Sequence, residues 1–307
     1  MLLHSLRLLL YRAIINGKVL LIYTGKPTML SERQLLPAIE LLLQSDALII
    51  AAGAGMGVDS GLPDFRGAAG FWNAYPALGA QRIAFHDIAS PAAFRRRPQE
   101  AWGFYGHRLA LYRQTVPHRG FQILLNWANS KNAGYSVFTS NVDGQFQLAG
   151  FEPQRINECH GSIHQLQCLL PCSDTIWSAD QFQPVVDEVR CRLQNMPPRC
   201  PRCGGLARPN ILMFDDCDWL EHCQQEQAKR QDRWLQTVFR PLVIEIGAGT
   251  AIPTVRHFSQ KIVQQYGGRL LRINLREPQV ASRHDVGLAA GAIDALTAID
   301  QALRSHP

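Results

Sequence analysis

Residues 47–66 read ALIIAAGAGMGVDSGLPDFR, and this stretch decides the fold class. Its first six residues form a short apolar run bounded by glycine, which is typical of a buried parallel β-strand. The glycines that follow let the backbone turn tightly and leave amide groups facing outward, where an α/β fold receives a pyrophosphate. Val58 stands where the usual dinucleotide-binding pattern has its third glycine. The spacing alone therefore supports a nucleotide site and a tight turn without a ligand equally well.

Predicted strands and helices alternate along the rest of the chain. Apolar or β-rich runs predict further strands at 135–139, 155–159, 242–246 and 269–274, with an extended segment at 208–214. Apolar residues at helical spacing predict helices at 31–45, 91–113 (broken near Pro98), 120–129, 218–238 and 287–302. Residues 67–72 are small or aromatic and are predicted to form a loop. This alternation predicts an α/β fold with a Rossmann-like, doubly wound parallel sheet.

Composition and charge are those of an ordinary globular protein. The chain has 307 residues, of which 46% are hydrophobic and 18% charged, and a formal net charge of +6. Residues 1–28 hold four basic residues and no acidic one, so they carry +4 and the remainder carries 6 − 4 = +2. A charge this small does not indicate nucleic-acid binding. We therefore expect no nucleic-acid partner.

Residues 1–30 are predicted to be an appendage to the main domain. Their apolar runs are interrupted by basic residues, so they reach neither the length of a membrane span nor the pattern of a secretory signal. Met29 is the next candidate initiator, and regular patterning begins just after it. An amphipathic targeting or membrane-surface helix stays an alternative for this segment. We expect no transmembrane segment and a cytoplasmic location.

Four of the eight cysteines have the spacing of a metal site. Cys168-x3-Cys172 and Cys200-x2-Cys203 form two pairs with 27 residues between them, and Pro and Gly flank the second pair. Without an export signal, a disulfide framework is not expected. Four thiolates complete a tetrahedral Zn²⁺ site and leave no open position for a substrate. The spacing therefore predicts one structural zinc ion, in a module inserted between the halves of the sheet.

Polar residues follow two predicted strands. Asn141 and Asp143 come just after the strand at 135–139, and His160 comes just after the strand at 155–159. Side chains at the carboxyl ends of parallel strands lie where α/β sheets hold ligands. A histidine at that edge is a candidate general base, because its unperturbed pKa lies near neutrality. A simple turn and a structural histidine stay open as alternatives.

The order of seven motifs adds a resemblance to a family. They are SGLPDFR (60–66), SNVDG (140–144), CHGS (159–162), the two cysteine pairs, RPNILMF (208–214), GAGT (247–250) and RINLREP (272–278). Each motif is weak by itself, but the whole series in this order resembles the sirtuin family of NAD-dependent protein deacylases. The resemblance covers roughly Ser31 to the C-terminus.

The resemblance implies a two-part catalytic domain at 31–307. The larger, Rossmann-like part would take about 31–66, 119–163 and 205–307, and the smaller part would take the helical segment 67–118 and the zinc knuckle 164–204. His160, Asn141 and Asp143 match the family's catalytic residues. The implied NAD site comprises Gly53, Ala54, Gly55, Asp64, Phe65, Arg66, Ser140, Asn141, Asp143, Gly247, Gly249, Thr250, Asn274 and Ala292. The implied substrate strand contributes Ile211, Leu212 and Phe214.

The implied reaction uses NAD as co-substrate and acylated protein lysines as partners. It transfers the acyl group from lysine to ADP-ribose with release of nicotinamide, and His160 acts as the base toward a ribose hydroxyl. Such chemistry requires positioning and exclusion of water, with Phe65 as a shield, rather than a protein nucleophile. A protein ADP-ribosyltransferase or NAD glycohydrolase, and a non-enzymatic NAD or ADP-ribose sensor, are the alternatives.

Tyr105 and Arg108 resemble the Tyr-x-x-Arg pair of class III sirtuins, which remove acidic acyl groups such as succinyl. Residues three apart share a helix face, so the hydroxyl and the guanidinium could bind one carboxylate together. The alternative is an aromatic core residue beside a surface arginine.

Four departures from the family pattern bear on NAD affinity and substrate choice. Gly57 stands where the family usually has serine, and Ala248-Gly249 stand where it has threonine-serine. Ser140 replaces a glutamine, and Asp215-Asp216 replace a Gly-Glu pair. We expect the catalytic trio to be intact and contacts to NAD to be altered.

Overall fold

The computed structural model describes residues 11–15, 18–22, 30–64 and 67–305. Its centre is a six-stranded, all-parallel sheet with the strand order β13-β12-β11-β3-β4-β5. The strands are β3 (Ala47–Ala52), β4 (Tyr135–Thr139), β5 (Ile156–Glu158), β11 (Pro241–Ile246), β12 (Arg269–Ile273) and β13 (Val286–Leu288). The chain builds outward from β3 in one direction and from β11 in the other. The switch in direction lies at the β3–β11 boundary, where open α/β sheets bind ligands.

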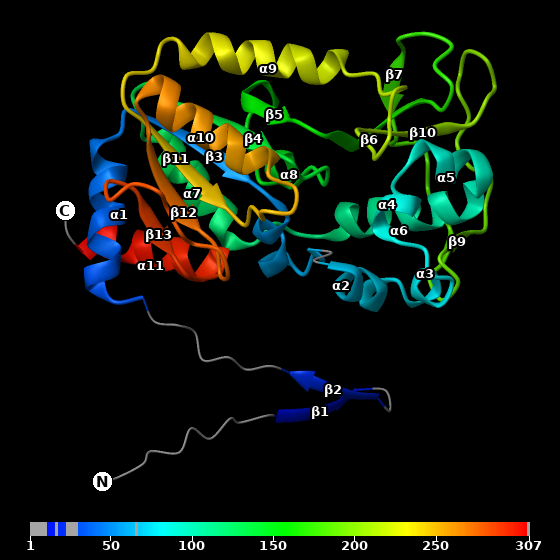
Figure 1. The fold of residues 1–307 in the computed structure, drawn as a ribbon, viewed down its shortest axis with the longest axis horizontal. Helices are drawn as coiled ribbons and strands as arrows, with labels where there is room; N and C mark the ends of the chain where they lie inside the picture. Colours follow the sequence, from blue (N-terminus) through cyan, green and yellow to red (C-terminus); the bar gives the residue numbers. More distant parts are fainter. Residues whose placement is uncertain (1–10, 16–17, 23–29, 65–66, 306–307) are drawn as a thin grey trace.

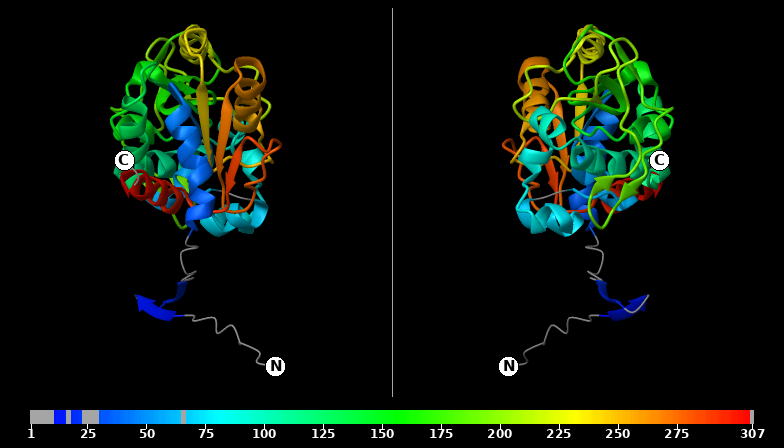
Figure 2. Two further views of the ribbon diagram at one scale, coloured as in Figure 1. Left: turned by 90° about the vertical axis from the view of Figure 1, so that its left-hand side faces the viewer. Right: turned by 90° about the vertical axis from the view of Figure 1, so that its right-hand side faces the viewer.

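Helices cover both faces of this sheet (Figures 1 and 2). Leu48, Ile50 and Ala52 of β3 pack toward α1 (Glu32–Gln44), α7 (Arg119–Asn129) and α11 (Ala292–Ser305). Ile49 and Ala51 pack toward α9 (His222–Leu235) and α10 (Thr254–Tyr266). Successive side chains of a strand point to opposite faces, so a strand buried on both faces is apolar throughout. The predicted doubly wound, Rossmann-like sheet is confirmed.

A smaller part adjoins the carboxyl end of the sheet, opposite the end where α1 lies in Figure 1. It contains a three-stranded antiparallel sheet with the order β10-β6-β7, a β8–β9 hairpin and a cluster of helices with a separate apolar core. The strands are β6 (Gly161–Cys168), β7 (Ile176–Ser178), β8 (Val186–Asp187), β9 (Arg192–Leu193) and β10 (Ala207–Ile211). The helices are α2 (Gly67–Ala74), α3 (Pro76–Ala80), α4 (Phe85–Ile88), α5 (Pro91–Arg96) and α6 (Pro98–Gln114).

Several local predictions were wrong. Residues 67–72 were expected in a loop but belong to α2, where alanine favours helix and Phe71 is buried in the smaller core. The last helix begins at Ala292 rather than at 287, because Val286–Leu288 extends the sheet edge as β13. The helix predicted at 218–238 is shorter and is α9. Three-residue strands carry too little periodicity to be seen in a sequence.

Two segments of the chain differ from the predictions made for them. Residues 205–214 were assigned to the larger part, but β10 pairs with β6 in the three-stranded sheet. The two-part division otherwise stays a prediction. Within residues 1–30, β1 (Tyr11–Ile15) and β2 (Lys18–Ile22) form an antiparallel pair where an amphipathic helix was the alternative. No helix in the described part of the chain is both long and apolar enough to cross a membrane.

Candidate active site and metal centre

Two glycine turns meet at the switch point of the sheet. Gly53 N donates to Ile246 O at 2.9 Å, and Gly55 N donates to Gly247 O at 3.1 Å. A Cβ atom at Gly53 would lie 2.8 Å from the Cα of Ala248, and one at Gly55 would lie 2.7 Å from the Cα of Gly247. Glycine is therefore required at both positions because the two turns pack backbone against backbone. The turns form one continuous wall.

This wall borders a cleft of about 670 Å³ between the two parts of the molecule. The cleft brings together most of the residues implied for NAD, catalysis and substrate. Its lining includes Gly53, Ala54, Gly55, Asp64, Tyr105, Arg108, Ser140, Asn141, Asp143, His160, Ile211, Leu212, Phe214, Gly247 and Gly249. Phe65 and Arg66 lie outside the described residues. The roles of these residues stay predictions, but their convergence on one cleft supports a common site.

Three implied NAD residues do not line the cleft. Asn274 is buried, and its side chain donates to Ala248 O at 2.9 Å and accepts from the backbone amides that follow it. Thr250 is exposed, and its hydroxyl donates to Glu277 Oε1 at 2.9 Å. Ala292 is buried at the start of α11. In this structure, the side chains of Asn274 and Thr250 form hydrogen bonds at the second glycine turn and do not line the cleft.

Asn141 and Asp143 follow β4 and are held by hydrogen bonds. Asn141 donates from its backbone to Thr139 Oγ1 at 3.0 Å and from Nδ2 to Gly53 O at 3.1 Å, so it joins the β4 end to the first glycine turn. The buried Asp143 accepts from Gln145 N at 3.0 Å. Burial raises the pKa of Asp143 to about 6, against the Gln145 amide and the Arg108 charge, which lower it.

His160 lies at the end of β5 and faces the same cleft. Burial lowers the pKa of its imidazole below the usual value, although a contact with the Ser140 backbone raises it. A lowered pKa keeps the ring neutral near pH 7, which is the form a general base requires. The carbonyl oxygen of His160 accepts from Leu212 N at 2.9 Å. His160 is thereby held beside the strand implied to bind substrate.

Strand β10, which the resemblance implies binds substrate, is anchored by a buried ion pair. Arg208 donates through Nη1 and Nη2 to Asp216 at 2.7 and 2.8 Å, and both side chains are fully buried. Asp216 also accepts from the backbone amides of Met213 and Asp218. Asp215 has a φ of 53°, so it takes the left-handed conformation for which the family's glycine is suited. Asp215-Asp216 therefore preserves both features of the family's Gly-Glu pair. Asp216 supplies the carboxylate, and Asp215 takes the left-handed backbone conformation.

We predict that Asp216→Ala lowers the free energy of unfolding by about 3–5 kcal/mol, because it leaves the Arg208 charge buried without its partner. Urea denaturation followed by fluorescence measures this change. Asp215→Gly is the matched control, since it removes an exposed carboxylate and suits the local φ, and we expect it to change stability by less than about 0.5 kcal/mol. Equal losses in the two variants would contradict the anchoring role.

Aromatic side chains surround Arg108 at one end of the cleft. Its Nε donates to Tyr112 Oη at 2.9 Å, and its guanidinium carbon lies 5.1 to 5.7 Å from the ring centroids of Phe104, Tyr105 and Tyr112. Burial raises the pKa of Tyr105 to about 12, although Arg108 lowers it, so the hydroxyl stays a neutral donor. Tyr112 was not predicted as a site residue. The sequence feature that could have indicated it is its position four residues after Arg108, on the same helix face.

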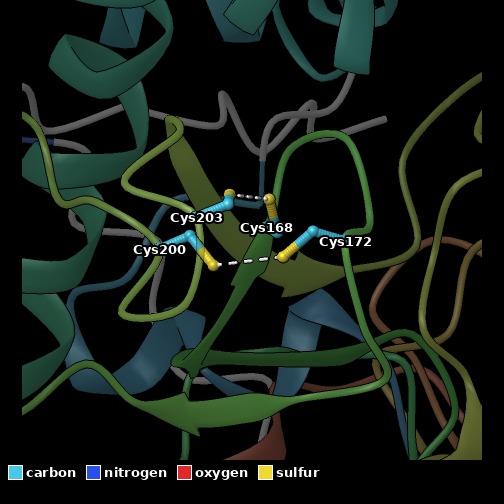
Figure 3. Close-up of side chains that lie close together, drawn as sticks. All are labelled: Cys168, Cys172, Cys200 and Cys203. Atoms are coloured by element: carbon cyan, nitrogen blue, oxygen red, sulfur yellow. Dashed lines mark hydrogen bonds between the residues drawn. The ribbon is translucent and has the colours of Figure 1, made fainter.

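The four paired cysteines converge as predicted (Figure 3). The Sγ atoms of Cys168 and Cys203 lie 3.6 Å apart, as do those of Cys172 and Cys200, and all four lie within 4.8 Å of one another. Tetrahedral coordination with Zn–S bonds of about 2.3 Å requires sulfur separations of roughly 3.8 Å. The donor set and its spacing thus fit a closed four-thiolate zinc site, and none of the four cysteines lines the cleft.

Comparison with known proteins decides the family. The model of the Sir2 family matches residues 53–237, which is more than half of the chain. The chain belongs to the Sir2 family. It is 27% identical over 271 residues to the NAD-dependent protein deacylase of Pyrococcus furiosus, covering 86% of this chain and 96% of that protein. It is 29% identical to the NAD-dependent protein deacetylase of Saccharolobus solfataricus, with coverages of 80% and 87%.

Other relatives match over shorter spans or in structure alone. The chain is 32% identical to the NAD-dependent protein deacylase of Aeropyrum pernix over 178 residues, which is 62% of that protein's length. A solved Sir2 homologue in complex with NAD has a TM-score of 0.67 at 22% identity and covers 92% of this chain and 96% of the homologue. That likeness supports the Sir2 fold.

The structure shows what surrounds the residues that depart from the family pattern. A Cβ atom at Gly57 would lie 3.1 Å from Leu62 Cδ1, so a serine there would require Leu62 to yield slightly. Ala248 is buried, and its carbonyl accepts from Arg256 and Asn274, whereas a Cβ atom at Gly249 would meet open space. Both glycine turns are therefore intact, but they lack the hydroxyl groups that the family has at positions 57, 248 and 249.

Proposed function

We propose that this Sir2-family chain is an NAD-dependent protein lysine deacylase that transfers the acyl group to ADP-ribose and releases nicotinamide. The observation that carries the proposal is the convergence of His160, Asn141 and Asp143 on one cleft, between the paired glycine turns and the end of β10. The names of the relatives that match over most of the chain support the same activity. Acylated protein lysines are the implied partners.

The cleft residues fit NAD by their chemistry. The first turn lines the cleft with backbone at Ala54 and Gly55, and a glycine turn after a parallel strand is where α/β folds hold a pyrophosphate. Asn141 and Asp143 would hold the nicotinamide and ribose end. When bound, NAD supplies a glycosidic carbon that loses nicotinamide and accepts the acyl oxygen. The protein residues would orient this carbon and exclude water from it.

His160 would take a proton from a ribose hydroxyl at its neutral imidazole. Its backbone bond to Leu212 places the base next to the edge of β10. Leu212 is 41% exposed, whereas Ile211 is buried, so the strand end has one accessible and one anchored residue. An extended substrate peptide would add to this edge by β-augmentation and present its acyl-lysine to the cleft.

The Arg108 end of the cleft supports a preference for acidic acyl groups. Arg108 and Tyr105 both line the cleft, and the rings of Phe104 and Tyr112 flank the guanidinium. A succinyl or malonyl carboxylate could bind both side chains, whereas an acetyl group has no charge to engage them. We propose that acidic acyl-lysines are better substrates than acetyl-lysine.

We predict that Arg108→Met lowers kcat/KM for a succinyl-lysine peptide by roughly 10- to 100-fold, because one charged hydrogen-bonding partner is lost. The same variant should change kcat/KM for the acetyl-lysine peptide of identical sequence by less than about threefold. Steady-state assays with the two peptides measure the ratio. Equal losses on both would refute the carboxylate role and leave Arg108 as a structural residue.

Product analysis separates deacylation from the alternatives. The protein is incubated with NAD and with acetyl-, succinyl- or unmodified lysine peptides, and the products are identified by mass spectrometry. O-acyl-ADP-ribose supports the deacylase. ADP-ribosylated protein, or free ADP-ribose without acyl transfer, supports a transferase or a glycohydrolase. No release of nicotinamide would contradict both enzymes and favour an NAD sensor. A cytoplasmic location stays a prediction from the sequence.

A further inference from the structure

The second glycine turn has little side-chain packing around it. The turn follows β11, and its residues Gly247, Ala248 and Gly249 line the cleft. A Cβ atom at Gly249 would meet nothing within 4 Å, and residues 250–252 are exposed. Ala248 and Gly249 stand where the family has threonine and serine, so the hydroxyl groups of those residues are absent as well. Hydrogen bonds from other segments therefore hold this turn.

Arg256, the third residue of α10, donates several of these hydrogen bonds. Its Nε and Nη2 atoms donate to Ala248 O at 3.1 and 3.0 Å, and Nη2 also donates to Glu277 O at 2.9 Å. The Arg256 side chain is 13% exposed and pairs with the Glu277 carboxylate at 3.2 Å. A planar guanidinium can bond two groups at fixed angles. Arg256 thus joins the turn after β11 to the loop after β12.

Two further side chains complete this attachment. Asn274 Nδ2 donates to Ala248 O at 2.9 Å, and Thr250 Oγ1 donates to Glu277 Oε1 at 2.9 Å. The carbonyl oxygen of Ala248 therefore accepts from three nitrogen atoms, two of Arg256 and one of Asn274. Neither Arg256 nor Asn274 lines the cleft, whereas Ala248 does. The Ala248 carbonyl is thus directed away from the cleft.

The direction of this carbonyl fixes the direction of the Gly249 amide. No cis peptide bond occurs among the described residues, and a planar trans peptide directs its N–H opposite to its C=O. The Gly249 N–H is therefore directed away from Arg256 and Asn274, to the side on which the turn borders the cleft. Within the described part of the chain, no protein group accepts a hydrogen bond from this amide. Backbone amides presented in this way suit an anionic oxygen such as that of a phosphate.

We propose that Arg256 is a positioning residue for NAD: it holds the second glycine turn so that the Gly249 amide faces the cleft and bonds a phosphate oxygen of the dinucleotide. The proposal rests on the proposed function, in which this turn belongs to the NAD site. Arg256 does not line the cleft, so it acts through the turn and not by contact with NAD. In this chain, its hydrogen bonds to the backbone take the place of the hydroxyl groups that are absent at positions 248 and 249.

Arg256→Met tests the proposal, because it keeps a long side chain and removes every donor. Titration calorimetry with ADP-ribose measures binding without any reaction. We expect the dissociation constant to rise by roughly 10-fold or more, the size of one lost hydrogen bond to a charged group. In steady-state assays KM for NAD should rise by a similar factor, while kcat at saturating NAD stays within about threefold, because the loss lies in binding.

Two further variants separate positioning from charge. Lys261 is another cation of α10 and is 44% exposed, so Lys261→Met removes the same charge without touching the turn. We expect it to bind ADP-ribose within about twofold of the wild type. Arg256→Lys keeps the charge but replaces the planar fork with a single ammonium group, and it should weaken ADP-ribose binding by roughly threefold or more. Circular dichroism and zinc content establish that each variant is folded.

Wild-type affinity for ADP-ribose in folded Arg256→Met or Arg256→Lys would overturn the proposal. A fall in kcat with an unchanged KM for NAD would also overturn it, as would an equal loss of binding in Lys261→Met. If Arg256→Met does not fold, Arg256→Lys decides, and failure of both to fold would make Arg256 a structural residue and refute the proposal.

Calorimetry also distinguishes this proposal from the proposed function. If the wild type binds ADP-ribose but transfers no acyl group, the proposed function fails and the binding series still decides the role of Arg256. A wild type that binds neither NAD nor ADP-ribose would overturn both. Weaker binding in both Arg256 variants, with wild-type binding in Lys261→Met, supports the positioning role.

Discussion

Replacing His160 with alanine is expected to lower kcat/KM for deacylation by roughly 1000-fold, within the range that general-base catalysis supplies. The reason is geometric: the neutral, partly buried imidazole lines the cleft beside Asn141 and is held next to β10 through the bond from Leu212. Steady-state assays with an acylated peptide and saturating NAD measure the loss. Zinc content and melting temperature should stay close to those of the wild type.

The matched control is His222→Ala, because His222 is exposed at the start of α9 and is not part of the cleft lining. We expect that variant to keep wild-type activity within about twofold. Loss of zinc or of folded structure in His160→Ala would show that His160 is a structural residue. Undiminished acyl transfer would rule out its role as the base.

Removing one zinc ligand is expected to have the largest effect on stability. In Cys200→Ser the bound zinc should fall to well below one ion per chain, and the melting temperature should drop by roughly 10 °C or more, since metal binding contributes folding free energy directly. Cys168 ends β6, which pairs with β10, so loss of the metal should also loosen β10, the strand proposed to bind substrate. Deacylation should decline in parallel.

Metal analysis by mass spectrometry and thermal unfolding measure these changes. Cys217→Ser is the control, because Cys217 is exposed and lies outside the four-sulfur cluster. We expect it to retain zinc and stability. A Cys200→Ser variant that keeps a full zinc ion would contradict the four-thiolate centre, and one that loses zinc without any loss of stability would contradict its structural role.

The sequence predicted those features of the molecule that are determined by residues close together in the chain. Ligand spacing predicted the zinc site, because a knuckle places its two cysteines through a few neighbouring residues. The run at 47–52 predicted the central strand, since a strand buried on both faces must be apolar throughout. The glycines at 53 and 55 predicted a tight turn, but not its close packing against the second glycine turn.

The rest depends on contacts between distant segments. The short strand β13 exists because β12 offers it an edge, and β10 leaves the large sheet because β6 pairs with it. Asn274 carries the expected amide, but it braces Ala248 rather than lining the cleft. Tertiary packing determines such features, and local propensity does not.

The most direct test of the central claim follows the acyl group itself. A lysine peptide whose acyl group carries a heavy-isotope label is incubated with NAD and the protein, and nicotinamide, freed peptide and labelled O-acyl-ADP-ribose are quantified by mass spectrometry. The cleft geometry predicts that the three products form in equal amounts and that the label moves entirely to ADP-ribose. Release of nicotinamide while the label stays on the lysine would contradict the assignment of this protein as a deacylase.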